Sequence, residues 1–443
     1  MRREGISPGL RLGVATVDIT PRHPVPLAGF ASRRSAFVAV DRPLLLKAWA
    51  FESGEPAGGA PVRALFVQAD LIWWGSERLP ALLRELSSRW GLPASAVILH
   101  ATHTHGGPQT SDRFAPSLGL PDEDYVRDLE ARLLSCVDDA FARLEPVAVE
   151  RGRGACAIGV HRRRRIDGRI AMAPNPEGPC DPEVVVVRFR RADGTTAGVW
   201  AHYACHPTTT DDNVVHPDFP GIAMTLTERW LGEGATASYL QGCCGDIRPA
   251  LVQDGGFRKG ERSDVLELGR RLADEVVRIL EGPMERLEPA KLASGRLAVE
   301  LPLEGVPGPG RLKEAAAADG IRGEWARLLS SRPDRLAPTI PLELNGVRIA
   351  RGLTLLAMNA EMVGAYGAFA KSYAQGAALP LPYSNGMIGY VPTAEQLAEG
   401  GYEPAESAYY FALPSPFAPE VEARVVESMK ALLDNVLEWE EME

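Results

Sequence analysis

The sequence predicts an α/β protein in which mixed central β-sheets are flanked by helices. Along its 443 residues, short runs rich in Val, Ile, Leu and aromatic residues alternate with stretches of helical periodicity. Turn residues, mostly glycine and proline, separate these segments. The hydrophobic fraction of 45% and the charged fraction of 24% are ordinary for a globular chain.

The first hundred residues predict four strands and one helix. The helix is expected at residues 79–90, because four leucines there follow helical spacing and Gly91 then ends the pattern. The strands are expected at residues 12–19, 44–51, 64–71 and 97–101.

The rest of the chain predicts the same alternation. Further helices are expected at residues 122–144, 222–231, 262–280, 363–374 and after Pro419. Further strands are expected at residues 147–159, 183–189, 196–203, 237–241, 297–303 and 348–359. Residues 304–340 are rich in Pro, Gly and Ala and then helical. We interpret them as an inserted connector within a single catalytic domain that spans residues 1–443.

Charge and hydropathy exclude several classes of function. The formal net charge of −10 argues against a nucleic-acid binder, whose affinity depends on neutralising phosphates. No apolar run reaches the roughly 18 residues of a membrane span. Residues 1–13 lack the apolar core of a secretory signal, so a cytoplasmic location is expected. The six cysteines form no CxxC pair and are expected to be buried thiols.

Four of the eight histidines fall in two groups, each at the end of an expected strand. His103 and His105 belong to the segment HATHTHGGP, and His202 and His206 to the segment HYACHP. Side chains two residues apart in an extended chain share one face, so His103 and His105 are expected to approach one ion together. The proline after His206 disfavours a helix and predicts a loop.

These groups point to a catalytic metal. Neutral imidazole is the commonest metal ligand, and two or three imidazoles with a carboxylate are typical of catalytic zinc. Glu361 follows an apolar strand and is the candidate carboxylate, with a surface glutamate as the alternative. The spacing permits either His202 or His206 to bind the ion, and another first-row metal could replace zinc. The alternative for the histidines is a set of hydrogen-bonded core residues.

Taken together, these segments resemble the neutral/alkaline non-lysosomal ceramidase family. The resemblance extends from DITP at residues 18–21 to GYVPTAEQLAEGGYE at residues 389–403. Its most specific motif is ATHTHGGP at residues 101–108, which is similar to the family's HTHxGP signature. The resemblance implies the fold of that family's catalytic domain. The C-terminal sandwich domain of the ceramidases is expected to be absent, because the chain ends soon after the tyrosine motif.

The resemblance also implies roles for individual residues. The implied zinc ligands are His103, His206 in the segment ACHPTTT, Glu361 and Tyr390. His105 is then on the substrate side, and Tyr402 matches a tyrosine that binds the reacting oxygen. Arg162 sits where the family has an Asn-Arg pair, with His161 in place of the asparagine. Arg162 opens a run of four arginines, two of which we interpret as part of a solvated loop.

Arg248 is the main departure from the family pattern. It lies in QGCCGDIRPAL, which is similar to the family's Gly-Asp-Val-Ser-Pro segment, and it stands where that family has its proposed serine nucleophile. A guanidinium stays charged and cannot be a nucleophile. We interpret Arg248 as binding a carboxylate or another anion on the substrate. Pairing with Asp246 or another internal acid is the alternative.

The sequence therefore predicts a zinc-dependent hydrolase of an amide or ester bond in a small polar or acidic molecule. Water activated at zinc would attack the carbonyl, and His105 would move a proton to the leaving group. Zinc, Tyr402 and backbone amides of the Gly245 turn would stabilise the oxyanion. Two alternatives stay open. One is a metal- and ligand-binding protein without hydrolase activity. The other is an N-acyl lipid amidase that uses another hydroxyl, from Thr208–Thr210 or Ser238.

Overall fold

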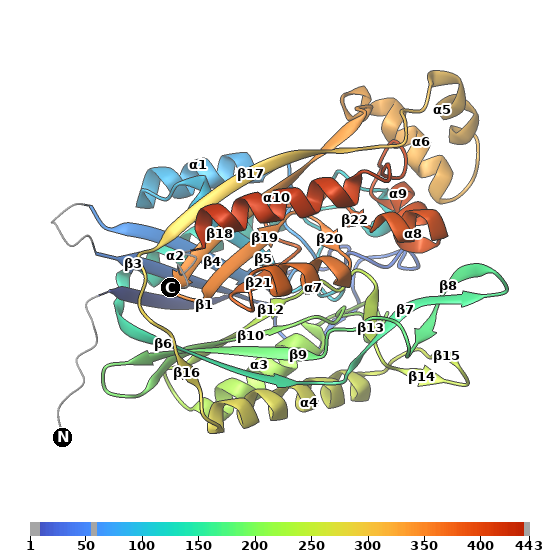
Figure 1. Ribbon diagram of the computed structural model, residues 1–443. Helices are drawn as coiled ribbons and strands as arrows, with labels where there is room; N and C mark the ends of the chain where they lie inside the picture. Colours follow the sequence, from blue (N-terminus) through green and yellow to red (C-terminus); the bar gives the residue numbers. More distant parts are fainter. Residues whose placement is uncertain (1–8, 55–59, 438–443) are drawn as a thin grey trace.

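Two β-sheets with helices packed against them make up the computed structural model, which describes residues 9–54 and 60–437 (Figure 1). The larger sheet has nine strands and the smaller has four, and the remaining strands form short ribbons. The mixed α/β class that the alternation of segments predicts is confirmed. Within the described residues, no helix is both long and apolar enough to cross a membrane.

The large sheet is mixed, and its two edges approach each other at one end. Its order is β12-β10-β9-β6-β1-β3-β4-β5, with β16 beside β6; the pairs β10–β12 and β4–β5 are parallel. The backbone N–H of Gln241 on β12 donates to Nε2 of His100 on β5 at 2.9 Å. The strands are β1 (Leu10–Asp18), β3 (Leu45–Ser53), β4 (Val62–Ala69), β5 (Val97–Ala101), β6 (Glu145–Ala155), β9 (Glu183–Arg191), β10 (Thr196–Tyr203), β12 (Thr236–Gln241) and β16 (Glu285–Arg286).

An aromatic cluster fills the space between the large and the small sheet. Its ring centroids lie 4.8–5.7 Å apart, mostly in tilted or edge-on contacts, and all five side chains are buried. Its members are Trp49, Phe51, Phe66, Phe189 and Trp200. The cluster packs with the small sheet, whose strands are β17 (Ala293–Pro302), β18 (Thr339–Ala350), β19 (Leu353–Met358) and β21 (Ala378–Leu381).

Helices cover the outer faces of the sheets. Helix α2 packs on β1 and β3, α4 on β6 and β9, α10 on β17 and β18, and α7 on β21. The long helices are α1 (Leu79–Trp90), α2 (Glu123–Ala142), α3 (Asp218–Leu231), α4 (Arg262–Glu281), α6 (Ile321–Ser331), α7 (Gly364–Tyr373) and α10 (Val421–Val436). The short ones are α5 (Pro309–Ala316), α8 (Ala394–Glu399), α9 (Ser407–Tyr410), a π-helical turn (Tyr402–Glu406) and the 3₁₀ turns Ala94–Ala96, Pro116–Leu118 and Pro333–Arg335.

Short ribbons link the sheets and carry several of the candidate site residues. They pair β2 (Ala39–Val40) with β11 (Val214–Val215), β14 (Val252–Gln253) with β15 (Gly256–Phe257), and β20 (Glu361–Met362) with β22 (Tyr390–Val391). A three-stranded ribbon has the order β13 (Ile247–Pro249), β7 (Gly159–Ile166) and β8 (Arg169–Asn175).

Two secondary-structure predictions are wrong. The single strand expected at residues 348–359 is a hairpin of β18 and β19, which turns at Arg351–Gly352, where Gly352 has φ +76°. The arginine run is not a loop: all four arginines lie on β7, although Arg164 and Arg165 are solvent-exposed. The stretch at residues 304–340 does contain helices, α5 and α6, which pack around the buried Trp325.

Asp70, just after β4, is a buried acid beside the histidine segment. Its carboxylate accepts hydrogen bonds from the N–H of Leu45 at 2.9 Å and the amide of Gln68 at 3.1 Å. Burial raises the pKa of Asp70 to about 6. The folded state therefore holds the Asp70 proton more tightly than the unfolded state does. The stabilisation that the bound proton of Asp70 gives the folded state is complete below about pH 4, and it is lost as the pH rises through about 6.

Replacing Asp70 with asparagine is expected to remove this pH dependence. Urea unfolding of both proteins between pH 4 and pH 8 measures it. The stability of the variant relative to wild type should rise with pH, by up to roughly 3 kcal/mol. A stability difference that stays constant across this range would mean that Asp70 titrates with an ordinary pKa.

Candidate active site

His103 leaves the sheet at the end of β5 with a left-handed backbone. The strand ends at Ala101, and the φ angle of His103 is +62°. The prediction that His103 and His105 share a face of an extended chain is therefore wrong. The turn that follows still brings the two rings together, edge to face, with centroids 5.1 Å apart. The cluster thus depends on a tight turn after the strand, not on strand periodicity.

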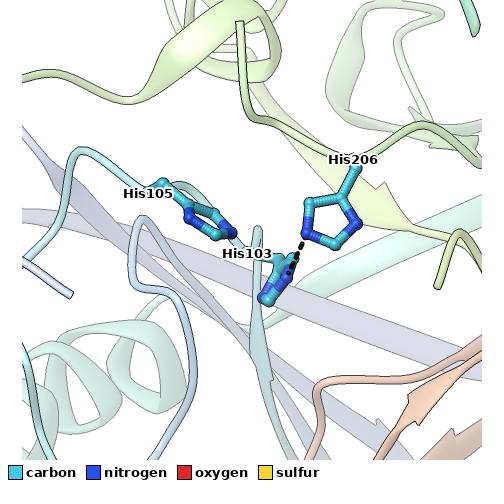
Figure 2. Close-up of side chains that lie close together, drawn as sticks. All are labelled: His103, His105 and His206. Carbon is cyan, nitrogen blue, oxygen red and sulfur yellow. Dashed lines mark hydrogen bonds between the residues drawn. The ribbon is translucent and has the colours of Figure 1, made fainter. Parts of the chain in front are cut away.

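His206 reaches the same place from the loop after β10, which the proline after it predicts. Its backbone N–H donates to the carbonyl of Ile247 at 3.3 Å. His202 is still part of β10 and points elsewhere: its Nε2 donates to the carbonyl of Pro380 at 3.0 Å. The structure therefore distinguishes the two histidines that spacing left equivalent. Figure 2 shows His103, His105 and His206 converging from two segments.

The hydrogen bonds of His103 and His206 fix which ring nitrogen carries the proton. Nδ1 of His103 donates to the carbonyl of Ile72 at 2.8 Å, and Nδ1 of His206 to the carbonyl of Cys244 at 3.4 Å. A carbonyl only accepts, so Nδ1 of each ring carries a proton, and in the neutral form of such a ring Nε2 carries the lone pair. These two Nε2 atoms face each other at 2.9 Å (Figure 2).

Glu361 adds a third acceptor to this pair. Its Oε2 is 3.4 Å from Nε2 of His103 and 4.0 Å from Nε2 of His206, and it has no hydrogen-bond donor among the described residues. Burial lowers the pKa of His206 well below its usual range, which keeps that ring neutral. Three buried acceptors that face one another, with no proton donor between them among the described residues, could together hold a cation.

The spacing suits a first-row metal. Tetrahedral zinc at 2.0–2.1 Å from nitrogen or oxygen ligands places neighbouring ligand atoms about 3.3 Å apart. The three separations of 2.9, 3.4 and 4.0 Å bracket that value. The carbonyls of Ile72 and Cys244 orient the rings in the way that outer partners orient metal-bound imidazoles. The donor set therefore fits the zinc that the sequence predicts.

Tyr390 lies beside Glu361, since β20 and β22 pair in parallel with these two residues in register. Its hydroxyl accepts a hydrogen bond from Nη2 of Arg162 at 3.1 Å. Tyr402 packs edge-on against Tyr390, with ring centroids 5.6 Å apart, and its hydroxyl makes no hydrogen bond within the described residues. The guanidinium of Arg162 lies 5.5 Å and 5.7 Å from the two ring centroids.

His105 is the third histidine of the cluster, and its ring has no hydrogen-bond partner among the described residues. Both ring nitrogens are buried and unpaired, and the ring lies against Phe30 at 4.8 Å. Burial lowers the pKa of His105 well below its usual range, and nearby His103 and the arginines at 33, 162 and 248 lower it further. A Cβ on Gly29 would lie only 2.2 Å from its Nδ1, so the loop leaves just enough room for the ring.

Arg248 lies on β13 with its guanidinium 4.4 Å from the ring centroid of Phe257. No carboxylate among the described residues pairs with it, and its Nε has no partner. Burial, and to a lesser degree the charge of Arg162, lower the pKa of Arg248 to about 10, so it stays charged at neutral pH. The alternative that Arg248 pairs with Asp246 is wrong. Asp246 instead accepts from the N–H of Gly364 at 2.8 Å and the amide of Gln396 at 2.9 Å.

Among the backbone amides of the Gly245 turn that the sequence predicts as oxyanion donors, that of Gly245 itself is occupied, because it donates to the carbonyl of Met362 at 2.9 Å. Sequence reasoning also missed two neighbours of the site. Tyr383 stacks on His103 with centroids 3.9 Å apart. Glu403 pairs with Arg162 at 2.7 Å. A signal for Glu403 was present in principle, since two buried arginines on one strand need an acid.

Fold and site together define a class: an α/β protein in which buried histidine and carboxylate acceptors converge in a group that could hold a metal ion. Residues 10–265, more than half of the chain, match the family described as neutral/alkaline non-lysosomal ceramidase, N-terminal. The chain belongs to this family, as the sequence motifs predict.

Comparisons with individual proteins agree with this assignment. The neutral ceramidase of Pseudomonas aeruginosa is 26% identical over 257 residues. That match covers 54% of this chain and only 37% of the relative. The crystal structure of neutral ceramidase from Pseudomonas aeruginosa superposes with a TM-score of 0.75 at 20% identity, over 98% of this chain and 76% of that one. A structure described as ceramidase complexed with C2 also gives 0.75, over 97% of this chain and 76% of the other.

Proposed function

We propose that this protein is a zinc-dependent hydrolase of amide bonds. Membership of the ceramidase family supports amide hydrolysis. The observation that supports a bound metal ion is the convergence of three buried acceptor atoms: Nε2 of His103, Nε2 of His206 and Oε2 of Glu361. With Tyr390 these residues would hold the ion, and bound zinc supplies Lewis acidity and lowers the pKa of water at the site.

His105 is the proton carrier in this proposal. Its ring is neutral and close to the metal-binding histidines, and neither nitrogen has a hydrogen-bond partner among the described residues. A neutral imidazole with one free lone pair can accept a proton from the attacking water and then deliver it to the leaving amine. Full burial and unpaired nitrogens would be costly for a histidine with a purely structural role.

In this proposal, Arg162 and Tyr402 stabilise negative charge on the reacting carbonyl oxygen. Arg162 contributes a fixed positive charge beside Tyr390, and the Tyr402 hydroxyl is free to donate. Preorganised donors in a site that excludes water stabilise a developing oxyanion more strongly than they would in solvent. The Gly245 amide itself is occupied, so the proposal assigns this role to these two side chains.

Arg248 directs the proposal toward a small acidic substrate. An arginine with no carboxylate partner near a second arginine is a strong site for an anion. A carboxylate on the leaving amine would satisfy it, so the substrate we propose is an N-acyl amino acid. Ceramide is the second candidate, because the similar protein from Pseudomonas aeruginosa is named a neutral ceramidase.

Two of the alternative nucleophiles, Ser238 and Thr209, have hydroxyls that are already engaged in hydrogen bonds. The Ser238 hydroxyl accepts from Nε1 of Trp49 at 2.9 Å in the buried aromatic core. The Thr209 hydroxyl donates to Asp218 at 2.5 Å. Neither is free to attack a substrate, which supports water as the nucleophile.

The test is release of amine from N-acyl amino acids and from short-chain ceramide, before and after removal of metal by a chelator. Turnover of the acidic amides that is lost on chelation and restored by zinc supports the proposal. Turnover of ceramide alone would mean that ceramide, the second candidate, is the substrate. Zinc binding without turnover of either substrate would indicate a metal- and ligand-binding protein without hydrolase activity.

A further inference from the structure

The arginine run on β7 continues into the metal site through one buried acid. Arg162 and Arg163 are consecutive on the strand, and both are buried. The pairing of β7 with β8 shifts register between His161 and Arg163, so the alternation of side chains is interrupted at Arg162 and one acid can pair with both buried charges. The carboxylate of Glu403, only 3% exposed, is a partner of both. Its Oε1 accepts from Nε of Arg162, and its Oε2 from Nη1 of Arg163, each at 2.7 Å.

A second acid extends the pairing towards the surface. Glu399 contacts Arg163 at 3.1 Å and Arg165 at 2.8 Å, and the latter arginine is exposed. The series of alternating charges therefore runs from the buried site to the solvent. Glu403 is its innermost acid and Glu399 its outermost.

The bond from Glu403 controls the direction in which Arg162 points. A guanidinium is planar and rigid, so a partner on Nε fixes where its Nη atoms lie. With Nε held by Glu403, Nη2 of Arg162 reaches the hydroxyl of Tyr390 at 3.1 Å. Glu403 and Tyr402 also belong to the same π-helical turn, Tyr402–Glu406. The carboxylate of Glu403 thereby fixes the orientation of the Arg162 guanidinium and anchors the turn that contains Tyr402.

We propose that Glu403 is a positioning residue for the metal centre: it orients Arg162 so that Arg162 holds the hydroxyl oxygen of Tyr390 beside Glu361. This inference rests on the proposed function, in which Tyr390 binds the ion. It assigns Glu403 a role that its neighbour Glu399, in the same series of ion pairs, does not share.

The test uses copper(II) as a spectroscopic probe of Tyr390 and zinc affinity as a second measurement. A tyrosine oxygen bound to copper(II) gives a charge-transfer band, which Tyr390→Phe should remove. Glu403→Gln is expected to shift or weaken this band and to lower zinc affinity about tenfold, the usual size of an outer-partner effect. The matched control Glu399→Gln should leave both unchanged. Equal effects of the two substitutions would overturn the inference.

A second pair of variants covers the case in which Glu403→Gln does not fold. Lysine cannot bridge two partners as a guanidinium does, so Arg162→Lys should reproduce the loss of band and of zinc affinity. Arg163→Lys disturbs the hydrogen bond to the other carboxylate oxygen of Glu403 and should leave the band and the zinc affinity unchanged. Equal effects of the two substitutions would contradict the role given to Glu403. The outcomes also separate this inference from the proposed function. A wild-type protein without the band means that Tyr390 is not a ligand, whereas a band that Glu403→Gln leaves unchanged refutes only the positioning role.

Discussion

Replacing His206 with alanine is expected to abolish zinc binding and amide hydrolysis together. The substitution removes one of the two Nε2 lone pairs that face each other at 2.9 Å. Loss of a direct ligand should exceed the 10–100-fold effect of an outer partner, so we expect zinc affinity to fall by roughly a thousandfold or more. Zinc titration with a competing chelator measures this, alongside kcat on an N-acyl amino acid.

His202→Gln is the matched control for this prediction. The glutamine amide can still donate to the carbonyl of Pro380, so the variant should keep zinc and activity. Spacing in the sequence makes His202 and His206 equivalent candidates, and this pair of variants distinguishes them. Loss of zinc in His202→Gln with retention in His206→Ala would show that the ligand assignment is reversed.

Replacing Arg248 with methionine is expected to lower kcat/KM for N-acyl amino acids by about a hundredfold, mainly through KM. The substitution keeps much of the packing against Phe257 but removes the unpaired charge. A charge-assisted hydrogen bond to a substrate carboxylate contributes roughly 1.5–3 kcal/mol, which corresponds to a roughly 10- to 150-fold change in kcat/KM. Steady-state kinetics on wild type and variant measure the effect.

The control for Arg248 lies in the substrate. An N-acyl amino acid amide has the same scissile bond without the carboxylate, so wild type and Arg248→Met should hydrolyse it at similar rates. Zinc content should be the same in both proteins. An equal loss on the charged and the neutral substrate would mean that Arg248 supports the fold of the site and does not recognise an anion.

Local patterns predicted those elements whose ends carry clear signals. The helix ending at Gly91 and the strands 97–101 and 196–203 agree with the structure residue for residue. The hairpin of β18 and β19 was missed because β19 and the second half of β18 are continuously buried, so buried residues stand on both sides of a very short turn. The strand β7 was missed because four arginines suggest solvent, whereas the two buried ones pair with Glu403, some 240 residues away.

Only part of the candidate site could be predicted from local sequence patterns. Histidines at strand ends indicated a metal, but periodicity gave the wrong reason for the pairing of His103 with His105, because a left-handed residue, not an extended chain, sets the geometry. The choice of His206 and Tyr390 came from family resemblance. Their proximity depends on the approach of β5 to β12 and on the pairing of β20 with β22, which are long-range contacts that no local pattern encodes.

The most direct test of the metal centre is the metal content of the purified protein, measured for wild type, His103→Ala and His23→Ala. His23 is a solvent-exposed histidine far from the cluster in sequence, so its variant controls for nonspecific binding to imidazole. We predict close to one zinc per chain in wild type and in His23→Ala, and almost none in His103→Ala. Metal-free wild type that remains active, or equal zinc in all three proteins, would contradict the account.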